Sequence, residues 1–147
     1  MTTRAEQYAP LPPERLERWS NFGNWETTFF PQFVGLQLEE LRQDYARMRL
    51  PYRPEFRQHA GVLHGGIIAT IADTVVVPAI GSGYDEPRDF FTIDLSLRFL
   101  APIVDEDAVA EGWVVRRGRS IIFCDAEVRS GAGKLAATAS LVYKVGS

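Results

Sequence analysis

The chain has 147 residues, of which 46% are hydrophobic, and its formal net charge is −3 at pH 7. A mildly acidic chain without a block of Lys and Arg argues against nucleic acid or an anionic membrane surface as a partner. No stretch reaches the ~18 consecutive apolar residues of a membrane span, and residues 1–10 lack the apolar run of a secretory signal. We therefore expect one globular domain over residues 1–147 in the cytoplasm.

Cys124 is the only cysteine and lies in the apolar segment IIFCDAEV. A lone cysteine has no partner for a disulfide or for a paired zinc site. We expect it to fill space in the core.

Residues 1–32 are expected to form an N-terminal arm and a short helix. Residues 1–12 end in APLPP, which is typical of a disordered or draped arm, and the following ERLERWSNFGNW predicts a short helix that stops at Gly23. Aromatic side chains are dense around this helix, namely Trp19, Phe22, Trp25, Phe29, Phe30 and Phe33. We favour a lid packed on the core over stacking on a ligand, and both hold if the lid borders a pocket.

The segment FVGLQLEELRQDYARMRLPY, which begins at Phe33, predicts a hairpin. Apolar residues at Val34, Leu36 and Leu38, and later at Tyr45, Met48 and Leu50, suggest two strands joined by a polar turn around residues 40–43. A helix over residues 39–48 competes, because Glu, Leu, Arg and Ala are good helix formers.

Residues 64–84 predict a long helix that contains a single carboxylate, Asp73. Apolar residues recur at helical intervals, at Ile67, Ile68, Ile71, Ala72, Val75, Val76, Ala79 and Ile80. The other side carries Gly66, Ala69, Thr70, Asp73 and Val77. A surface helix would show Lys and Glu there, so we expect this helix to be covered on most sides. Pro78 predicts a kink or an early end.

Asp73 has two interpretations. A carboxylate confined among uncharged groups is costly and is tolerated more often where chemistry requires it, whereas an Asp on an exposed strip is simply solvated. The turn before the helix favours the first interpretation. Gly65 and Gly66 leave N–H groups open at a helix N-terminus, where developing negative charge is stabilised.

The segment FFTIDLSLRFLAP is the clearest strand. Its residues alternate, with Phe91, Ile93, Leu95, Leu97 and Phe99 on one face and Thr92, Asp94, Ser96 and Arg98 on the other. Three more strands follow, separated by the turns RRGRS and SGAGK. The sequence therefore predicts an α+β fold in which a curved antiparallel sheet of about five or six strands wraps around one long central helix. The small side of the helix would still need cover, for which another subunit is the obvious source.

Three segments together resemble the hotdog-fold acyl-CoA thioesterases of the phenylacetic-acid-degradation type. They are HAGVLHGGIIATIADTVVVPAIG, FFTIDLSLRFLAPI and VVRRGRSIIFCDAEV, and the resemblance extends from Phe33 to Val145. Its most specific part is HGG followed by an acidic residue two helical turns later. The resemblance implies a single hotdog domain with its core over residues 33–147, a homodimer with shared active sites and a tetramer of two dimers. It implies hydrolysis of an acyl-CoA thioester without a metal or other cofactor.

The resemblance also implies roles for individual residues. Asp73 matches the acidic residue that acts as nucleophile or as general base toward water, and Gly65 matches the glycine whose N–H binds the thioester carbonyl. Gln58 matches an amide that holds the carbonyl or the water, and Thr92 matches a hydroxyl that holds the attacking water. His64 either positions the substrate or only supports the turn. Because Gln usually accompanies Glu in this family, the pairing of Gln58 with Asp73 leaves the subgroup open.

Substrate binding is implied for Gly66 and for the arginines around Gly118. Arg116, Arg117 and Arg119 lie in the turn where related proteins meet the nucleotide phosphates of coenzyme A. Arginine suits phosphate by charge and by its forked geometry. The alternative is a turn of solvated arginines.

Two other functions compete with hydrolysis. Hotdog domains also serve as non-catalytic acyl-CoA binding or sensing modules, but binding alone does not require the carboxylate. Hotdog hydratases and dehydratases place their histidine and acid differently. The acyl group, and the choice between coenzyme A and acyl carrier protein, stay open.

Overall fold

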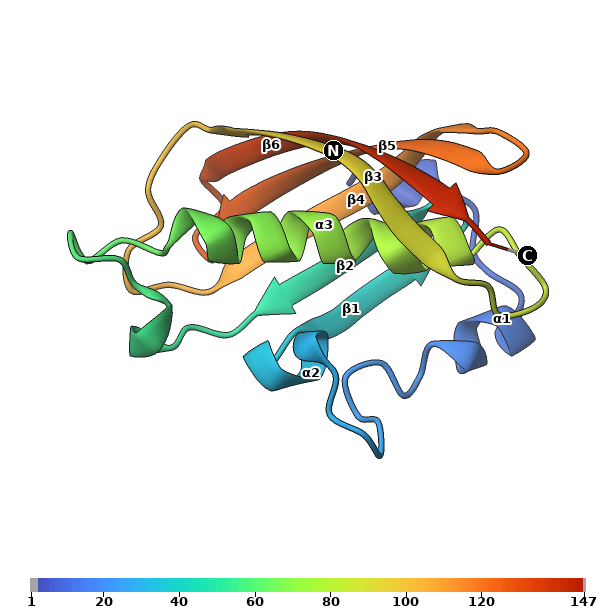
Figure 1. Ribbon diagram of the computed structural model, residues 1–147, viewed down its shortest axis with the longest axis horizontal. Helices are drawn as coiled ribbons and strands as arrows, with labels where there is room; N and C mark the ends of the chain where they lie inside the picture. The colour runs from blue at the N-terminus through green and yellow to red at the C-terminus, as the bar shows by residue number, and fades with distance from the viewer. Residues whose placement is uncertain (1–2, 147) are drawn as a thin grey trace.

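The long helix α3 (Gly65–Gly81) lies across a six-stranded antiparallel sheet in the computed structural model, which describes residues 3–146 (Figure 1). The strands are β1 (Gln37–Arg42), β2 (Tyr45–Leu50), β3 (Phe90–Phe99), β4 (Ala108–Arg117), β5 (Ile121–Ser130) and β6 (Leu135–Val145). Their order across the sheet is β1-β2-β4-β5-β6-β3. The predicted α+β hotdog fold is confirmed, and β3 forms one edge of the sheet.

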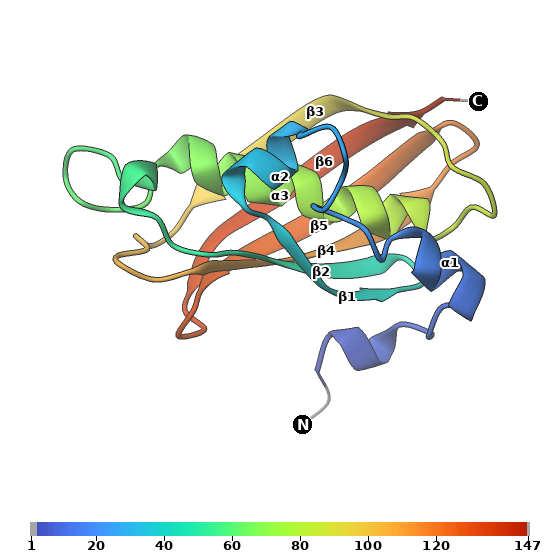
Figure 2. The same ribbon diagram turned by 90° about the horizontal axis from the view of Figure 1, so that it is seen from below.

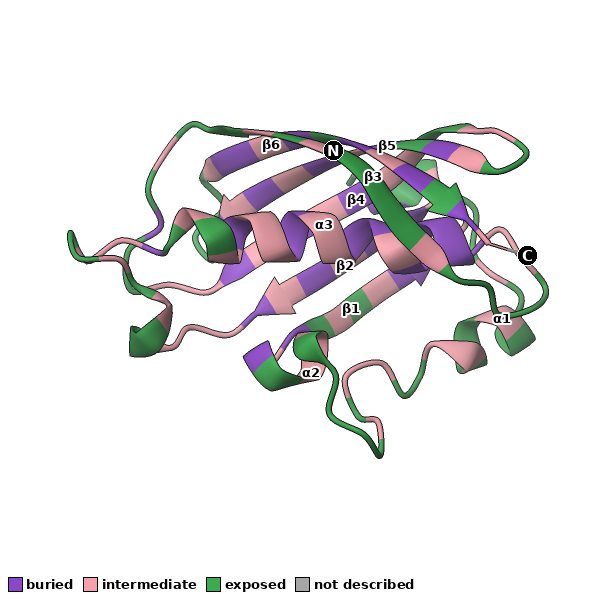
Figure 3. Ribbon diagram, in the orientation of Figure 1, coloured by how far each residue is buried: buried purple, intermediate pink, exposed green. Residues whose placement is uncertain are grey.

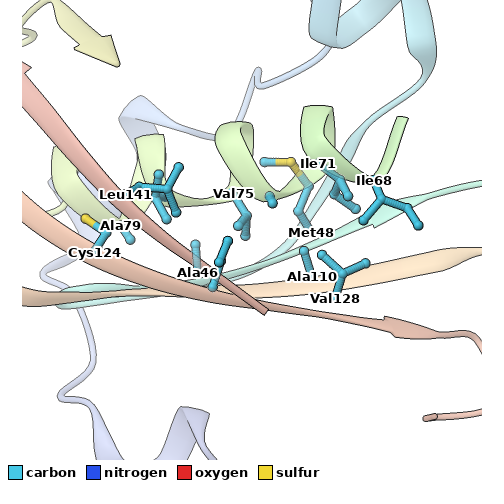
Figure 4. Close-up of a cluster of buried hydrophobic side chains, with 14 of the residues drawn as sticks. Ala46, Met48, Ile68, Ile71, Val75, Ala79, Ala110, Cys124, Val128 and Leu141 are labelled. Atoms are coloured by element: carbon cyan, nitrogen blue, oxygen red, sulfur yellow. The ribbon is translucent and has the colours of Figure 1, made fainter. Parts of the chain in front are cut away.

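The core lies between α3 and the concave face of the sheet (Figure 4). Helix residues such as Ile71 and Val75 face Met48 of β2, Ala110 of β4 and Leu141 of β6, and the sheet-facing side of α3 is buried (Figure 3). Burial of these apolar side chains removes their surface from water and so stabilises the fold.

Cys124 belongs to the same core and is 2% exposed, as expected of a space-filling residue. Burial raises the pKa of its thiol to about 12, so the side chain stays a neutral thiol at physiological pH.

Pro78 lies inside α3, which continues past it to Gly81. The proline has no N–H to donate to the carbonyl of Thr74 one turn earlier, and the helix ends within one turn after it. The amide of Ser82 donates to the carbonyl of Pro78 at 2.8 Å and closes the last turn.

The predicted hairpin is confirmed as β1 and β2, and the competing helix over residues 39–48 is wrong. The turn lies later than the predicted residues 40–43, because β1 continues to Arg42. The two strands are joined at Gln43 and Asp44, and Asp44 has a left-handed φ of 63°. The prediction fails just before the hairpin, because Val34 belongs to the short helix α2 (Phe30–Val34). Gly35, with φ 87°, ends that helix in the left-handed conformation that glycine adopts without steric cost.

Strand β3 does not have the single apolar face that its alternation predicts. Phe91 and Ile93 are 57% and 56% exposed. The β3 residues packed against the core are Phe90, Leu95 and Leu97. A bulge between Thr92 and Asp94 causes the difference, because the extra residue moves later side chains to the opposite face.

The N-terminal arm is draped over the sheet and continues toward the far end of α3 (Figure 2). It contains a 3₁₀ turn, η1 (Ala5–Gln7), where Arg4 bonds Glu127 at 2.8 Å and lies 3.9 Å from the ring centre of Trp113. Helix α1 (Pro13–Arg18) follows and ends earlier than predicted, while Gly23 occupies a left-handed turn after it.

A further 3₁₀ turn, η2 (Pro54–Phe56), leads from the hairpin to the loop before α3. Within residues 3–146, none of the helices combines the length and the apolar character that crossing a membrane requires.

Candidate active site

Two hydroxyl groups converge on one oxygen of Asp73. Thr92 Oγ1 donates to Asp73 Oδ1 at 2.8 Å, and the Tyr143 hydroxyl lies 2.6 Å from the same oxygen. The Tyr143 hydroxyl is also 2.6 Å from the main-chain carbonyl of Asp73. Among the described residues, Oδ2 of Asp73 accepts no hydrogen bond. The carboxylate is therefore fixed through Oδ1, and Oδ2 is free to accept a proton or to attack a carbonyl carbon.

The bulge in β3 explains this convergence. Thr92 is the direct cross-strand partner of Tyr143 just before the bulge, so both side chains point at α3 where Asp73 faces the sheet. The resemblance implies that Thr92 holds the attacking water, whereas in this structure its hydroxyl donates to the carboxylate of Asp73.

Tyr143 was missed in the sequence analysis. It is 2% exposed, and burial, reinforced by its hydrogen bond to Asp73, raises the pKa of its phenol well above the ordinary value of 10.0. The phenol stays protonated and remains a donor at neutral pH. Its signal in the sequence is its position in β6, where it alternates inward with Leu141 and Val145.

Asp73 lies in the wall of a cavity of about 420 Å³. The cavity follows α3 from Asp73 through Val77 to Gly81 and is bounded by Phe90 and Tyr143 of the sheet. The rest of its lining comes from the loop before β3, through Glu86 and Arg88, and from the N-terminal segment, through Trp19, Phe22, Trp25 and Pro31. Trp19, Phe22 and Trp25 of the predicted aromatic lid thus border a pocket over the C-terminal half of α3. The other three aromatic residues of the predicted lid are exposed and do not pack on the core as expected, namely Phe29, Phe30 and Phe33.

The glycine turn before α3 is organised by His64. The Nδ1 atom of His64 accepts a hydrogen bond from the N–H of Gly66 at 2.8 Å, so His64 caps the helix and the donor of Gly66 is occupied. Within residues 3–146, the N–H of Gly65 has no acceptor. It therefore remains available at a helix N-terminus, where a developing negative charge is stabilised.

Gln58 and Gly65 border a second cavity, of about 380 Å³, together with Phe99. The side-chain oxygen of Gln58 accepts a hydrogen bond from the N–H of Ala60. Gly65 precedes Asp73 by eight residues on α3, which corresponds to ~12 Å along the axis. The chain thus divides the predicted catalytic residues into two groups, one around Asp73 and one around Gly65.

The three predicted phosphate-binding arginines differ in their surroundings. Arg117 bonds Asp44 at 2.7 Å and lies 5.0 Å from the ring centre of Tyr84, so its charge is already paired. Arg116 and Arg119 are exposed. Arg117 is accordingly the least suited of the three to bind an external phosphate.

The sequence matches the family model described as the thioesterase superfamily over residues 60–137. A protein of Saccharolobus solfataricus named a "putative esterase" is 32% identical over 108 residues, which are 74% of this chain and 76% of that protein. The match to the family model, over residues 60–137, includes Gly65, Asp73 and Thr92 but ends before Tyr143.

Solved structures share the fold. The Escherichia coli PaaI protein from the phenylacetic acid degradation operon has a TM-score of 0.76 at 16% identity, covering 89% of this chain and 92% of its own. A hypothetical thioesterase protein of Streptococcus pneumoniae, solved with coenzyme A, has a TM-score of 0.69 at 20% identity, covering 76% of this chain and 85% of its own.

Proposed function

We propose that this chain, which belongs to the thioesterase superfamily, hydrolyses acyl-CoA thioesters to a free acid and coenzyme A. The observation that carries the proposal is the Asp73 carboxylate, which lies in an apolar cavity with one oxygen held by Thr92 and Tyr143. Coenzyme A is supported as the carrier by a protein of similar fold solved with that molecule.

In the proposed reaction, Oδ2 of Asp73 is the reactive atom. As general base it removes a proton from water while the water oxygen attacks the thioester carbon; as nucleophile it attacks that carbon itself. In both routes the carbonyl oxygen becomes negative, the C–S bond breaks and coenzyme A leaves as a thiolate that takes up a proton. The general-base route yields the free acid directly, whereas the nucleophilic route leaves an anhydride between Asp73 and the acyl group, which water hydrolyses to release the acid and restore the carboxylate. Thr92 and Tyr143 hold the carboxylate in position. The N–H of Gly65 from a second copy of the chain stabilises the oxyanion.

Such a reaction requires two copies of the chain. The base and the oxyanion donor must both lie within hydrogen-bond reach of the reacting group, whereas Gly65 and Asp73 of one chain are ~12 Å apart along α3. Ala69 lies midway between them, so a two-fold axis near Ala69 would bring Gly65 of one copy opposite Asp73 of the other. We therefore propose a homodimer with two shared sites, to which Gln58 also contributes.

The edge strand β3 supports this arrangement. An edge strand offers unpaired backbone groups for pairing with another copy. Phe91 and Ile93 on β3 are exposed apolar side chains that pairing could cover. The outer face of the sheet also carries exposed Val115 and Phe123, and there we propose the contact that joins two dimers into a tetramer.

We assign the chain to the phenylacetic-acid-degradation type within the superfamily. The support is the HGG turn with Asp73 at its spacing, together with the fold shared with Escherichia coli PaaI.

Release of free thiol tests the hydrolysis. A thiol reagent is used to follow turnover of phenylacetyl-, benzoyl-, butyryl-, octanoyl- and palmitoyl-CoA. Replacing Asp73 with Asn should lower kcat by about 10² to 10⁴-fold, as loss of a general base does. The matched control is Asp94→Asn, which changes an exposed carboxylate of the same strand as Thr92 and should leave kcat unchanged.

Two results would contradict the proposal. Turnover by Asp73→Asn at the wild-type rate would remove Asp73 from the mechanism. Tight acyl-CoA binding without turnover of any substrate would identify a binding or sensing module. The two chemical routes can also be separated by turnover in water that contains oxygen-18. Incorporation of oxygen-18 into the carboxylate of Asp73 would favour the nucleophilic route over the general-base route.

A further inference from the structure

We propose that residues 18–31 form one wall of an acyl-binding pocket within a single chain and select apolar acyl groups of medium length. The inference rests on the proposed hydrolysis and adds to it the class of acyl group. The segment lies outside the matched region 60–137, so this selectivity would come from the chain's own N-terminal part.

The wall is aromatic and faces the helix. Trp19, Phe22 and Trp25 line the cavity opposite Val77 of α3 and Phe90 of β3. Rings of this kind contribute large apolar surfaces that bind an acyl chain by removing it from water.

Gly81 allows the wall to approach the helix. A Cβ atom at position 81 would lie 2.2 Å from Cζ2 of Trp19, a separation that no side chain tolerates. The glycine therefore lets the indole pack directly on the helix backbone at the far end of the cavity.

The start of the segment is anchored to the end of α3. Arg15 Nη1 donates to the carbonyl of Ser82 at 3.1 Å, and Arg18 Nη1 donates to the carbonyl of Tyr84 at 3.1 Å, so α1 is fixed to the C-terminal end of α3. Within the following loop, the N–H of Trp25 donates to Oε1 of Gln32 in α2 at 2.9 Å.

The rings within the segment also support one another. Trp25 makes edge-to-face contacts with Phe22 at 5.1 Å and with Phe29 at 5.8 Å between ring centres. The wall is thus held in place by hydrogen bonds and by packing, which limits the width of the pocket.

The length of the apolar part sets the preferred acyl group. From Asp73 to Gly81 the cavity follows eight residues of α3, or ~12 Å. Beyond that point its lining includes Glu86 and Arg88, which are exposed and charged. A chain that ends near Gly81 gains burial along its whole length, whereas a longer chain would meet charge and water. At about 420 Å³ the cavity is also near the small end of ligand pockets.

Kinetics across chain lengths test the inference. Because each buried methylene is worth about fourfold in binding, kcat/KM should rise steeply from butyryl- to octanoyl-CoA and should not rise further for palmitoyl-CoA. Trp25→Ala should lower the octanoyl-to-butyryl ratio by about tenfold or more, since it removes part of the wall. Trp113→Ala is the control, because Trp113 lies beside Arg4 and outside the cavity. An unchanged ratio in Trp25→Ala would overturn the proposal.

A binding measurement keeps the proposal testable without turnover. Trp113→Phe leaves Trp19 and Trp25 as the only tryptophans, both in the wall, so their fluorescence reports occupancy. The octyl thioether of coenzyme A, which cannot be hydrolysed, should change this fluorescence at lower concentration than the butyl thioether, and Trp25→Leu should weaken the difference. Failure of all thioethers to change the emission would refute the pocket. Thioether binding without hydrolysis of any acyl-CoA would refute the thioesterase and leave the pocket standing.

Discussion

Thr92 and Tyr143 are cross-strand neighbours on β3 and β6, and their hydroxyls meet at a single oxygen of Asp73. The pairing depends on the bulge that follows Thr92, because without it the two strands would present different residues to the helix. These two contacts to Oδ1 fix the rotation of the carboxylate group. They therefore also fix the direction in which the other oxygen, Oδ2, points.

Removing either hydroxyl should therefore slow hydrolysis without weakening substrate binding. A hydrogen bond to a charged group contributes about 1.5–3 kcal/mol, so Tyr143→Phe and Thr92→Val should each lower kcat about tenfold to a hundredfold with little change in KM. The double variant should lose less than the product of the two effects, because both donors act on one atom. Thr92→Ser should recover activity; equal kcat values for Thr92→Ser and Thr92→Val would show that the hydroxyl has no role.

The N–H of Gly65 can be removed while the helix is preserved. Proline is favoured at the first position of a helix, and His64, with φ −61° and ψ 135°, already has the conformation that a following proline requires. Gly65→Pro should lower kcat by about 10² to 10³-fold, as loss of an oxyanion donor does.

Gly65→Ala is the matched control for that variant. A Cβ atom at position 65 lies 3.1 Å from Cζ of Phe99, so both variants disturb this ring, but alanine keeps the N–H. If kcat of Gly65→Ala falls as far as that of Gly65→Pro, the contact with Phe99 and not the donor accounts for the loss.

Shared sites predict complementation between inactive variants. Asp73→Asn and Gly65→Pro should each be nearly inactive alone, yet a refolded equal mixture should recover about a quarter of wild-type activity, since half of the dimers contain one intact site. Activity that equals the average of the two variants would indicate sites formed within one chain.

Replacing Arg119 and replacing Arg117 should have different effects, the first on substrate binding and the second on stability. Arg119 is exposed, and Arg119→Ala should raise KM for acyl-CoA but not for the corresponding acyl-pantetheine, which lacks the nucleotide. Arg117 bonds Asp44, so Arg117→Ala should mainly lower the free energy of unfolding. An unchanged KM for acyl-CoA in Arg119→Ala would exclude it from phosphate binding.

Alkaline pH should destabilise the fold through its buried tyrosines. Burial raises the pKa values of Tyr45 and Tyr143 above 10.0, with hydrogen bonds to Glu111 and Asp73 adding to the effect. Above pH 10.0 the unfolded chain loses these protons while the native chain keeps them, so the free energy of unfolding falls by about 1.4 kcal/mol per pH unit for each tyrosine. Urea unfolding should show a shallower fall for Tyr143→Phe; the same slope as in wild type would contradict this assignment.

The helix itself, its glycine turn and the spacing from His64 to Asp73 were determined by the sequence alone. These features depend on neighbours a few residues apart, and apolar periodicity and capping are local signals. The hairpin of β1 and β2 is local for the same reason.

Only the tertiary structure decided how the site is completed. Tyr143 reaches Asp73 across 70 residues of sequence, and the wall formed by Trp19, Phe22 and Trp25 comes from the opposite end of the chain. The bulge beside Thr92 divided the expected apolar face of β3, so that Phe91 and Ile93 are exposed while Leu95 and Leu97 pack on the core. Such relationships follow from strand register and long-range packing, which alternation within a single segment does not encode.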